Sequence, residues 1–176
     1  MRKTTVIGLL LIFPLLVFGQ PKWDSLWLPL KQLAGSWSGK GEGQPGKGKY
    51  ERTYQFVFGR TFFQVDNKAT YPPSDKKPAG EVHEDKGFYS YDRSRKTFVF
   101  RQFHIEGFVI QYRLDSISPD KKTIVFISES IENIPKGFRA RETYRILDEN
   151  EMEEIFELAA PGKDFEVYTR VRFRRH

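Results

Sequence analysis

Apolar and polar residues alternate in short runs from Lys49 to the end of the chain, and turn residues separate the runs. Phe, Tyr, Val, Ile and Thr dominate these runs, whereas long stretches of Ala, Leu, Glu and Lys are absent. A period of two with this composition is typical of strands that bury one face. The pattern predicts an all-β fold. One face of the first run carries Tyr50, Arg52, Tyr54, Phe56 and Phe58.

Turn sequences divide this region into about nine or ten short strands, spaced as in an antiparallel meander. Because closure removes unpaired strand edges, we expect the meander to form a single β-barrel. Residues 71–86 are rich in Pro, Gly and charge and are expected to form a long loop that leads into a strand near Glu81. The other expected strand regions are 50–66, 87–91, 97–103, 108–114, 123–130, 141–147, 151–159 and 165–174.

A short helix is expected before the strands, within residues 24–33. Trp23, Trp27, Leu30 and Ala34 recur at helical spacing, and Pro29 limits the helix to a turn or two. Its apolar side chains are suited to covering one end of a barrel. We therefore expect this helix to plug that end.

A glycine-rich stretch, residues 33–43, follows the helix. Gly39, Gly41 and Gly43 leave one face of a strand without side chains, so the strand can bend or let another backbone approach closely. Trp37 needs a core site and is expected to close one barrel end. The stretch thus indicates the first strand of a small closed barrel.

Residues 1–19 have the pattern of a secretory signal peptide. Arg2 and Lys3 precede an apolar run, and Gly19 stands at a suitable cleavage position. An uncleaved N-terminal anchor is the alternative. We expect cleavage after Gly19, export to the periplasm or the exterior, and a single domain over 20–176. No second apolar run has transmembrane length, so the mature chain is expected to be soluble, without a membrane span.

Composition narrows the functional classes further. The chain has 176 residues and no cysteine, which excludes disulfides, thiolate metal sites and cysteine nucleophiles. The net charge is +6, but acidic and basic residues alternate closely, and the one basic concentration is at Arg170, Arg172, Arg174 and Arg175. Nucleic-acid binding would need a broader basic stripe. We expect no nucleic-acid partner.

A candidate ligand-contacting face follows from the period of two in 98–114. If the even positions face inward, Gln102 and His104 interrupt an aromatic lining and would orient a ligand. On the last strand Tyr168 and Arg170 are further candidate lining groups, because barrel interiors that hold ligands are partly polar. The predicted ligand-binding residues are Trp37, Phe98, Phe100, Gln102, His104, Phe108, Ile110, Tyr112, Tyr168 and Arg170.

The sequence contains no motif that specifies a reaction. His83 falls in the charged region and is expected to be solvated, and His104 is interpreted either as a hydrogen-bonded core residue or as a ligand contact. His104 and Glu106 would share a strand face, but no third ligand is evident, so no metal site is predicted. Glu153 and Glu154, as neighbours, point to opposite faces. The prediction is a binding protein without catalysis.

The glycine-rich strand resembles the opening of the nitrobindin-type heme-binding β-barrels. The shared features are residues 35–43, Glu51, Phe56, a glycine-marked hairpin at 58–60 and the endings 157–160 and 173–175. The broader Gly-x-Trp signature is similar to that of lipocalins and fatty-acid-binding proteins, which makes the fold calycin-like. The resemblance implies a ten-stranded barrel that binds heme or another hydrophobic ligand.

The resemblance also implies where a heme iron would be held. In nitrobindin-like proteins a histidine of the last strand holds the iron, whereas this chain has Tyr168, Thr169, Arg170 and Val171 there. Tyrosine serves as an axial ligand in some heme proteins. Fatty-acid-binding proteins hold a carboxylate with an Arg-x-Tyr pair, and Tyr168 with Arg170 has the reverse order.

Three functions follow as hypotheses. The first is an exported barrel that binds a small hydrophobic molecule, since 16 Phe, 8 Tyr and 3 Trp exceed the needs of a minimal core; the alternative is that the rings fill a closed core. The second is a heme protein for a diatomic gas or peroxide, with Tyr168 or His104 as axial ligand. The third is a structural or interaction module whose C-terminal arginines meet an acidic surface or a glycan. The oligomeric state stays open.

Overall fold

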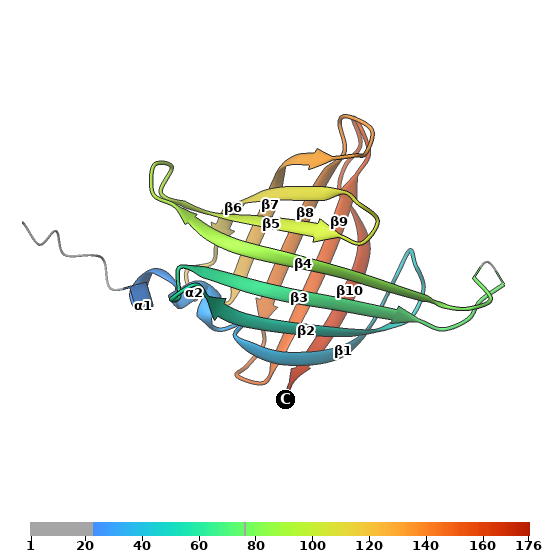
Figure 1. Cartoon of the computed structure of the whole chain (residues 1–176), viewed down its shortest axis with the longest axis horizontal. Helices are drawn as coiled ribbons and strands as arrows, with labels where there is room; N and C mark the ends of the chain where they lie inside the picture. The colour runs from blue at the N-terminus through green and yellow to red at the C-terminus, as the bar shows by residue number, and fades with distance from the viewer. Residues whose placement is uncertain (1–22, 76) are drawn as a thin grey trace, which may run out of the picture.

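The computed structural model describes residues 23–75 and 77–176 and shows a closed β-barrel with two short helices at one end (Figure 1). The predicted signal peptide, residues 1–19, lies outside the described residues. The helices are α1 (Trp23–Leu26) and α2 (Leu28–Lys31). The strands are β1 (Gly35–Gly43), β2 (Gly48–Val57), β3 (Phe62–Tyr71), β4 (Glu81–Asp92), β5 (Thr97–His104), β6 (Val109–Ile117), β7 (Thr123–Glu132), β8 (Arg139–Ile146), β9 (Glu151–Ala159) and β10 (Glu166–Arg175).

Each strand pairs antiparallel with its neighbour in the sequence, and β1 pairs with β10 to close the barrel. The predicted all-β meander is therefore confirmed. Arg175, at the end of β10, reinforces the closure. Its guanidinium group donates hydrogen bonds to the backbone carbonyls of Gln32 and Ala34. The same group lies 4.1 Å from the centre of the Trp37 indole ring.

The glycines of β1 allow β10 to approach closely. A Cβ atom placed on Gly39 or Gly43 would collide with the β10 backbone, and one on Gly41 would lie 2.6 Å from a Val171 methyl group and 2.7 Å from the Arg170 carbonyl oxygen. Side chains at these positions would force the two strands apart. The expectation of a close backbone approach is thus confirmed, and its partner is the last strand.

The helices cover one end of the barrel, as predicted, but as two separate turns and not one helix. Pro29 lies at the start of α2, where a missing N–H costs nothing. Trp27 is 1% exposed and contacts the rings of Phe56, Phe63 and Phe98, from three different strands. Trp37 is also buried, and its indole N–H donates to the Leu33 carbonyl at 2.7 Å. Trp27 therefore fills the centre of the covered end.

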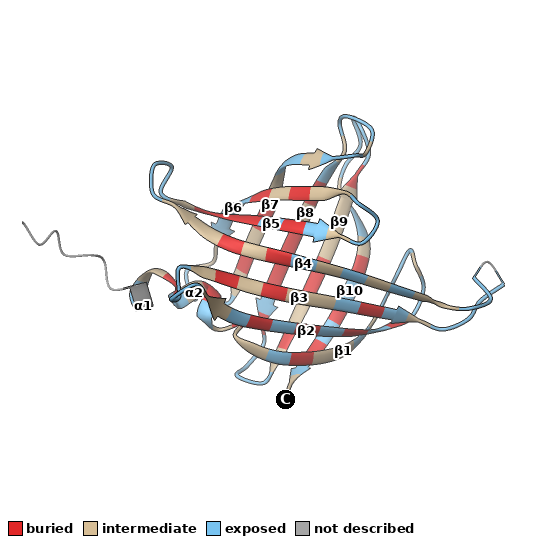
Figure 2. Ribbon diagram, viewed as in Figure 1, coloured by how far each residue is buried: buried red, intermediate tan, exposed pale blue. Residues whose placement is uncertain are grey.

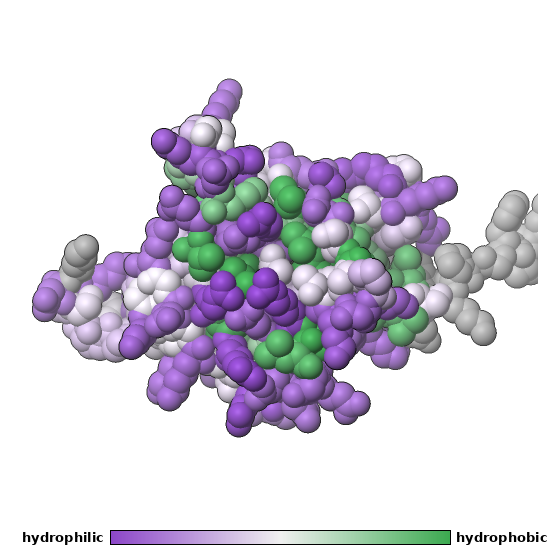
Figure 3. All heavy atoms as spheres, turned by 180° about the vertical axis from the view of Figure 1, so that it is seen from behind, coloured by the Kyte–Doolittle hydropathy of each residue, from purple (hydrophilic) through white to green (hydrophobic). Residues whose placement is uncertain are grey.

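Burial alternates along the strands, with inward positions buried and outward positions exposed (Figure 2). Hydrophilic residues predominate on the outer face drawn in Figure 3, with apolar patches between them. None of the helices in the described part of the chain has the length and apolar character needed to cross a membrane as a helix. The barrel interior is where the fold concentrates both its aromatic residues and its buried charges.

Candidate functional site: a cavity in the open half of the barrel

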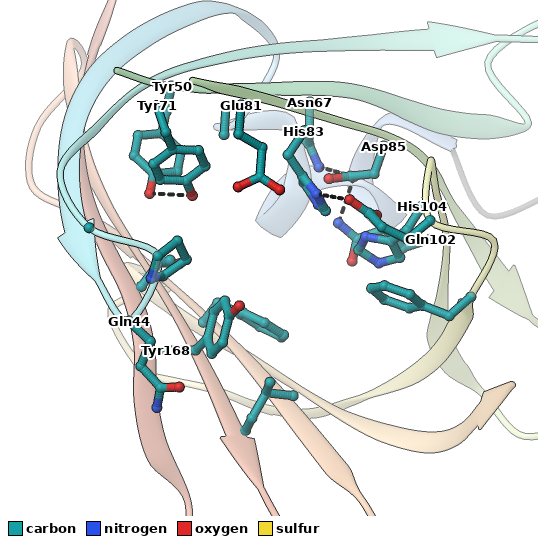
Figure 4. A pocket seen from close by; sticks show the side chains of 18 of the residues that line it. Gln44, Tyr50, Asn67, Tyr71, Glu81, His83, Asp85, Gln102, His104 and Tyr168 are labelled. Carbon is teal, nitrogen blue, oxygen red and sulfur yellow. Dashed lines mark hydrogen bonds and ion pairs between the residues drawn. The ribbon is translucent and has the colours of Figure 1, made fainter. Parts of the chain in front are cut away.

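A cavity of about 810 Å³ occupies the half of the barrel away from the helices (Figure 4). Loop residues 44–47 and 72–74 border it, and inward side chains of the strands form its walls. Ligand cavities in proteins typically measure ~300–1,000 Å³. The alternative that aromatic rings fill the whole interior is therefore wrong, and they fill only the half next to the helices. The apolar wall residues include Phe108, Ile110, Ile131, Phe138, Phe156 and Leu158.

A buried ion pair forms part of the cavity floor. Arg52 donates from Nη2 to Glu154 Oε1 at 2.7 Å and from Nε to Oε2 at 3.2 Å, and both side chains are less than 10% exposed. The guanidinium also donates to the Glu51 carbonyl at 3.0 Å. Such a pair has lost its hydration, and its two-pronged geometry compensates for that loss.

Glu142 lies beside this pair and is 6% exposed. Burial raises the pKa of its carboxyl group well above the ordinary value of 4.5, and the negative charge of Glu154 raises it further. Its Oε2 has no hydrogen-bond partner among the described residues. A protonated carboxyl group here would be a hydrogen-bond donor facing the cavity.

His83, Asp85 and His104 gather on one wall of the cavity (Figure 4). Asp85 of β4 stands opposite His104 of β5 in the strand register, and His83 lies two residues earlier on the same face as Asp85. One potential ligand atom from each of the three side chains lies within 4.8 Å of the other two. Asp85 Oδ1 accepts from Asn67 Nδ2 at 2.5 Å and from Gln102 Nε2 at 2.7 Å.

His104 has no hydrogen-bond partner for either ring nitrogen among the described residues. Its ring stacks on Phe108 with centroids 4.0 Å apart. Burial lowers the pKa of His104 to about 4, so the imidazole is neutral at pH 7. The interpretation of His104 as a hydrogen-bonded core residue is therefore wrong, because this imidazole presents unused lone-pair and N–H capacity beside the cavity.

His83 also differs from its expected place. It lies within β4 and is half-buried, because β4 begins at Glu81 and pairs with β3 as far as Tyr71. Its Nδ1 lies 2.5 Å from Glu106 Oε1. The solvated loop position expected for His83 is thus wrong, since the strand carries it onto the cavity wall.

The predicted ligand-contacting residues divide into three groups. Gln102, His104, Phe108, Ile110 and Tyr168 line the cavity. Four others are buried in the packed half and do not line it, because the rings of that half fill the space between them: Trp37, Phe98, Phe100 and Tyr112.

Arg170, the third group, lies on the outer face of β10, where it pairs with Glu153 at 3.0 Å. The prediction that Arg170 lines the cavity is wrong, because the alternation of β10 turns Thr169 and Val171 inward and Arg170 outward. Tyr168 reaches the cavity despite its sequence position because the β9–β10 pairing shifts register between Val167 and Thr169. Arg172 and Arg174 likewise bond Glu151 on the outer face.

Sequence reasoning missed Arg52, Glu142, Glu154 and Asp85 as site residues. Each of the first three is a charged residue on a strand face where the residues two positions before and after it are mostly apolar. Arg52, for example, lies between Tyr50 and Tyr54. A charge in that pattern is a signal for a buried polar group. Asp85 gives no such signal, because its neighbours in the sequence are charged.

Comparisons with known proteins agree with this architecture. The family model for the THAP4-like, heme-binding beta-barrel domain matches residues 27–175. The crystal structure of Rv2717c from M. tuberculosis matches with a TM-score of 0.64 and 17% identity, covering 86% of this chain and 97% of that one, which supports the fold alone. A de novo designed fluorescence-activating beta barrel matches over 83% of this chain and 95% of its own at 14% identity, with a TM-score of 0.41, too low to carry an argument.

A search of curated proteins gives no match. The resemblance to nitrobindin-type barrels is nevertheless confirmed, because the family model covers nearly all of the barrel, from Trp27 in the helical plug to Arg175 at the end of β10. The chain therefore belongs to the family of THAP4-like, heme-binding beta-barrel domains.

Proposed function

We propose that this barrel binds a small hydrophobic molecule with one polar end and performs no reaction on it. The observation that carries the proposal is the cavity of about 810 Å³, whose walls are mainly apolar and whose floor is polar. Ligand sites commonly combine apolar walls with a few polar groups that fix orientation. The family supports a ligand-binding role in general.

The two parts of the lining suggest how such a ligand lies. Phe108, Ile131 and Phe156 offer apolar surface along the walls. Deeper in the barrel, the unpaired Glu142 Oε2 and the Arg52–Glu154 pair offer hydrogen-bonding groups. A ligand with its polar end toward this floor satisfies these groups while burying its apolar body.

Binding of 8-anilinonaphthalene-1-sulfonate, an apolar molecule with one polar end, tests this proposal. Its fluorescence is titrated with the purified protein in the presence of EDTA, and native mass spectrometry identifies any molecule that co-purifies. We expect saturable 1:1 binding that weakens at least about tenfold in Ile131→Trp, because the indole occupies cavity volume. Leu147→Trp places the same side chain on the exposed outside and is expected to bind like the wild type. Equal affinity in both variants, or no saturable binding, would contradict the proposal.

Heme is the second candidate ligand, and the family name favours it. The residues fit a heme in two respects: the cavity has sufficient volume, and two side chains capable of axial ligation, His104 and Tyr168, line it (Figure 4). The unpartnered ring nitrogens of His104 are the specific observation in its favour. A bound heme would supply an iron for diatomic gases or peroxide.

Titration with hemin tests the second candidate. We expect a Soret band at one equivalent that shifts or disappears in His104→Ala or Tyr168→Phe, whichever side chain holds the iron. His176→Ala is the matched control, because His176 bonds Ser38 at the exposed end of β10. A band that is absent, or unchanged in both variants, would dismiss heme.

Export is the remaining part of the proposal. It rests on the positive start, the apolar run and the Gly19 position of the sequence. Expression of the full sequence in a bacterium, fractionation and N-terminal sequencing test it. We expect a product that begins at Gln20 outside the cytoplasm, whereas an intact N-terminus in the cytoplasm would contradict export.

A further inference from the structure

The His83, Asp85 and His104 cluster has a composition and a placement that the proposed hydrophobic ligand does not require. Two imidazoles and one carboxylate come from adjacent strands, β4 and β5, and their side chains border the same cavity. We infer that these three residues bind a divalent first-row transition metal ion whose open coordination positions face the cavity. This site is distinct from heme ligation, because all of its ligands are protein side chains.

Each of the three side chains has a free ligand atom. His104 has two ring nitrogens without a partner in the described part of the chain. Both hydrogen bonds to Asp85 are accepted by Oδ1, which leaves Oδ2 for an ion. His83 bonds Glu106 through Nδ1, which leaves Nε2. A neutral imidazole and an ionised carboxylate are the protonation states that metal binding requires.

The surrounding contacts resemble the outer shell of known metal sites. A carboxylate accepts only, so the short contact of His83 with Glu106 is a hydrogen bond from Nδ1–H, which fixes the tautomer and directs the Nε2 lone pair away from Glu106. Asn67 and Gln102 hold the Asp85 carboxylate in the same way. Phe108 stacks on His104 and restricts its ring orientation. Such contacts orient ligands before the ion arrives.

The distances are compatible with one ion. Zinc ligands of this kind lie ~2.0–2.2 Å from the metal and therefore up to about 4 Å from each other. One potential ligand atom from each side chain lies within 4.8 Å of the other two, so small side-chain rotations can bring three ligands to one ion. With only three protein ligands, the ion keeps positions for water or for a ligand in the cavity.

The ligand set also limits the kind of metal. Two imidazoles with one carboxylate suit Zn²⁺, Fe²⁺, Co²⁺ and Ni²⁺, whereas Ca²⁺ and Mg²⁺ prefer all-oxygen sites. We therefore use Co²⁺ as the probe, because its visible absorption reports the ligands, and Zn²⁺ as the competitor.

The experiment is a metal titration of the full chain after treatment with EDTA and its removal. We expect one Co²⁺ per chain with visible absorption bands, displacement by one Zn²⁺, and no effect of excess Mg²⁺. His104→Ala and Asp85→Asn should weaken Co²⁺ binding at least about 100-fold, and Glu106→Gln about 10–100-fold because Glu106 acts through His83. His176→Ala should bind like the wild type.

Circular dichroism and a cooperative urea transition establish that each variant folds, and His83→Ala provides a replacement at a half-exposed position if His104→Ala does not fold. Absence of 1:1 binding, or binding equally tight in the His104 and Asp85 variants, would overturn the site. Since the metal titration contains no organic ligand and the probe titration contains EDTA, either proposal can fail alone.

Discussion

The two halves of the barrel use the same strands and the same alternation for opposite purposes. In the half next to the helices, rings such as Tyr89, Phe100 and Phe126 pack face to face and edge to face, with Tyr89 and Phe100 only 4.1 Å apart. Farther along the same strands, Asp85 and Gln102 take the inward positions, and the interior becomes hollow and polar. Each strand therefore contributes to stability through the segment next to the helices and to ligand binding through the segment farther from them.

Trp27→Ala is expected to have the largest effect, because it removes the central ring of the packed half. The free energy of unfolding should fall by ~3–5 kcal/mol, as for other buried large-to-alanine changes. Urea denaturation measures this loss. Affinity for the fluorescent probe should stay within about twofold of the wild type.

Phe108→Ala is the matched change in the open half. It should lower the affinity for the fluorescent probe at least about threefold, because Phe108 borders the cavity. The loss in the free energy of unfolding should be smaller than for Trp27→Ala, because Phe108 is only half-buried. Equal losses of stability and affinity in both variants would remove the distinction between the halves.

Arg52→Ala tests the boundary between the halves. The substitution leaves the Glu154 carboxylate buried without its cation, so we expect a loss of ~3–5 kcal/mol in the free energy of unfolding. Arg170→Ala removes an exposed pair with Glu153 from the outside and should cost ~0–1 kcal/mol. Similar values for the two variants would show that the floor of the cavity is hydrated like the surface.

Gly41→Ala tests the seam that both halves share. The new methyl group meets Val171, the Arg170 carbonyl and the Tyr50 ring, so we expect a loss of ~1–3 kcal/mol from overpacking. Lys40→Ala changes the neighbouring exposed position and should leave the urea midpoint nearly unchanged. A neutral Gly41→Ala would mean that β1 and β10 can separate without cost.

Glu142→Gln has an effect that depends on pH. Because the pKa of Glu142 is raised in the folded state, the folded chain holds this proton more tightly than the unfolded chain. The associated stability is complete below about pH 4.5 and is lost as pH rises toward the folded-state pKa.

As pH rises above about 4.5, the wild type should therefore lose stability relative to Glu142→Gln, because the pKa of Glu142 is raised in the folded state. Urea denaturation at several pH values measures the difference between the two proteins. Glu132→Gln makes the same carboxyl-to-amide change at an exposed position and serves as the control. A constant difference for Glu142→Gln would contradict a protonated carboxyl group in the floor.

Most of the fold was accessible from the sequence because alternation and turn residues report strands directly. Alternation also placed Gln102 and His104 on an inward face. It does not report depth along the barrel axis, so Phe98 and Phe100 could not be separated from Phe108 as core or lining. The helix prediction identified the plug but not its division into two turns at Trp27.

The metal-binding cluster lay beyond sequence reasoning for a different reason. His83 and His104 are 21 positions apart, and only the pairing of Asp85 with His104 brings them together. Register between two strands depends on the loop that joins them and on every other pair of the sheet. A strand starting near Glu81 was predicted, but the charged neighbours of His83 concealed that its side chain lines the cavity.

The closure of the barrel by β1 and β10 has a consequence for folding kinetics. Trp37 of β1 pairs with Arg175 of β10, so one edge of β1 remains unpaired until the last strand has formed. Contacts that span this much sequence are slow to form, because the chain must lose loop entropy before they contribute. Until then the bare glycine edge of β1 is an open template for any extended segment. Before β1 and β10 pair, the chain is therefore a curved sheet with two unpaired edges.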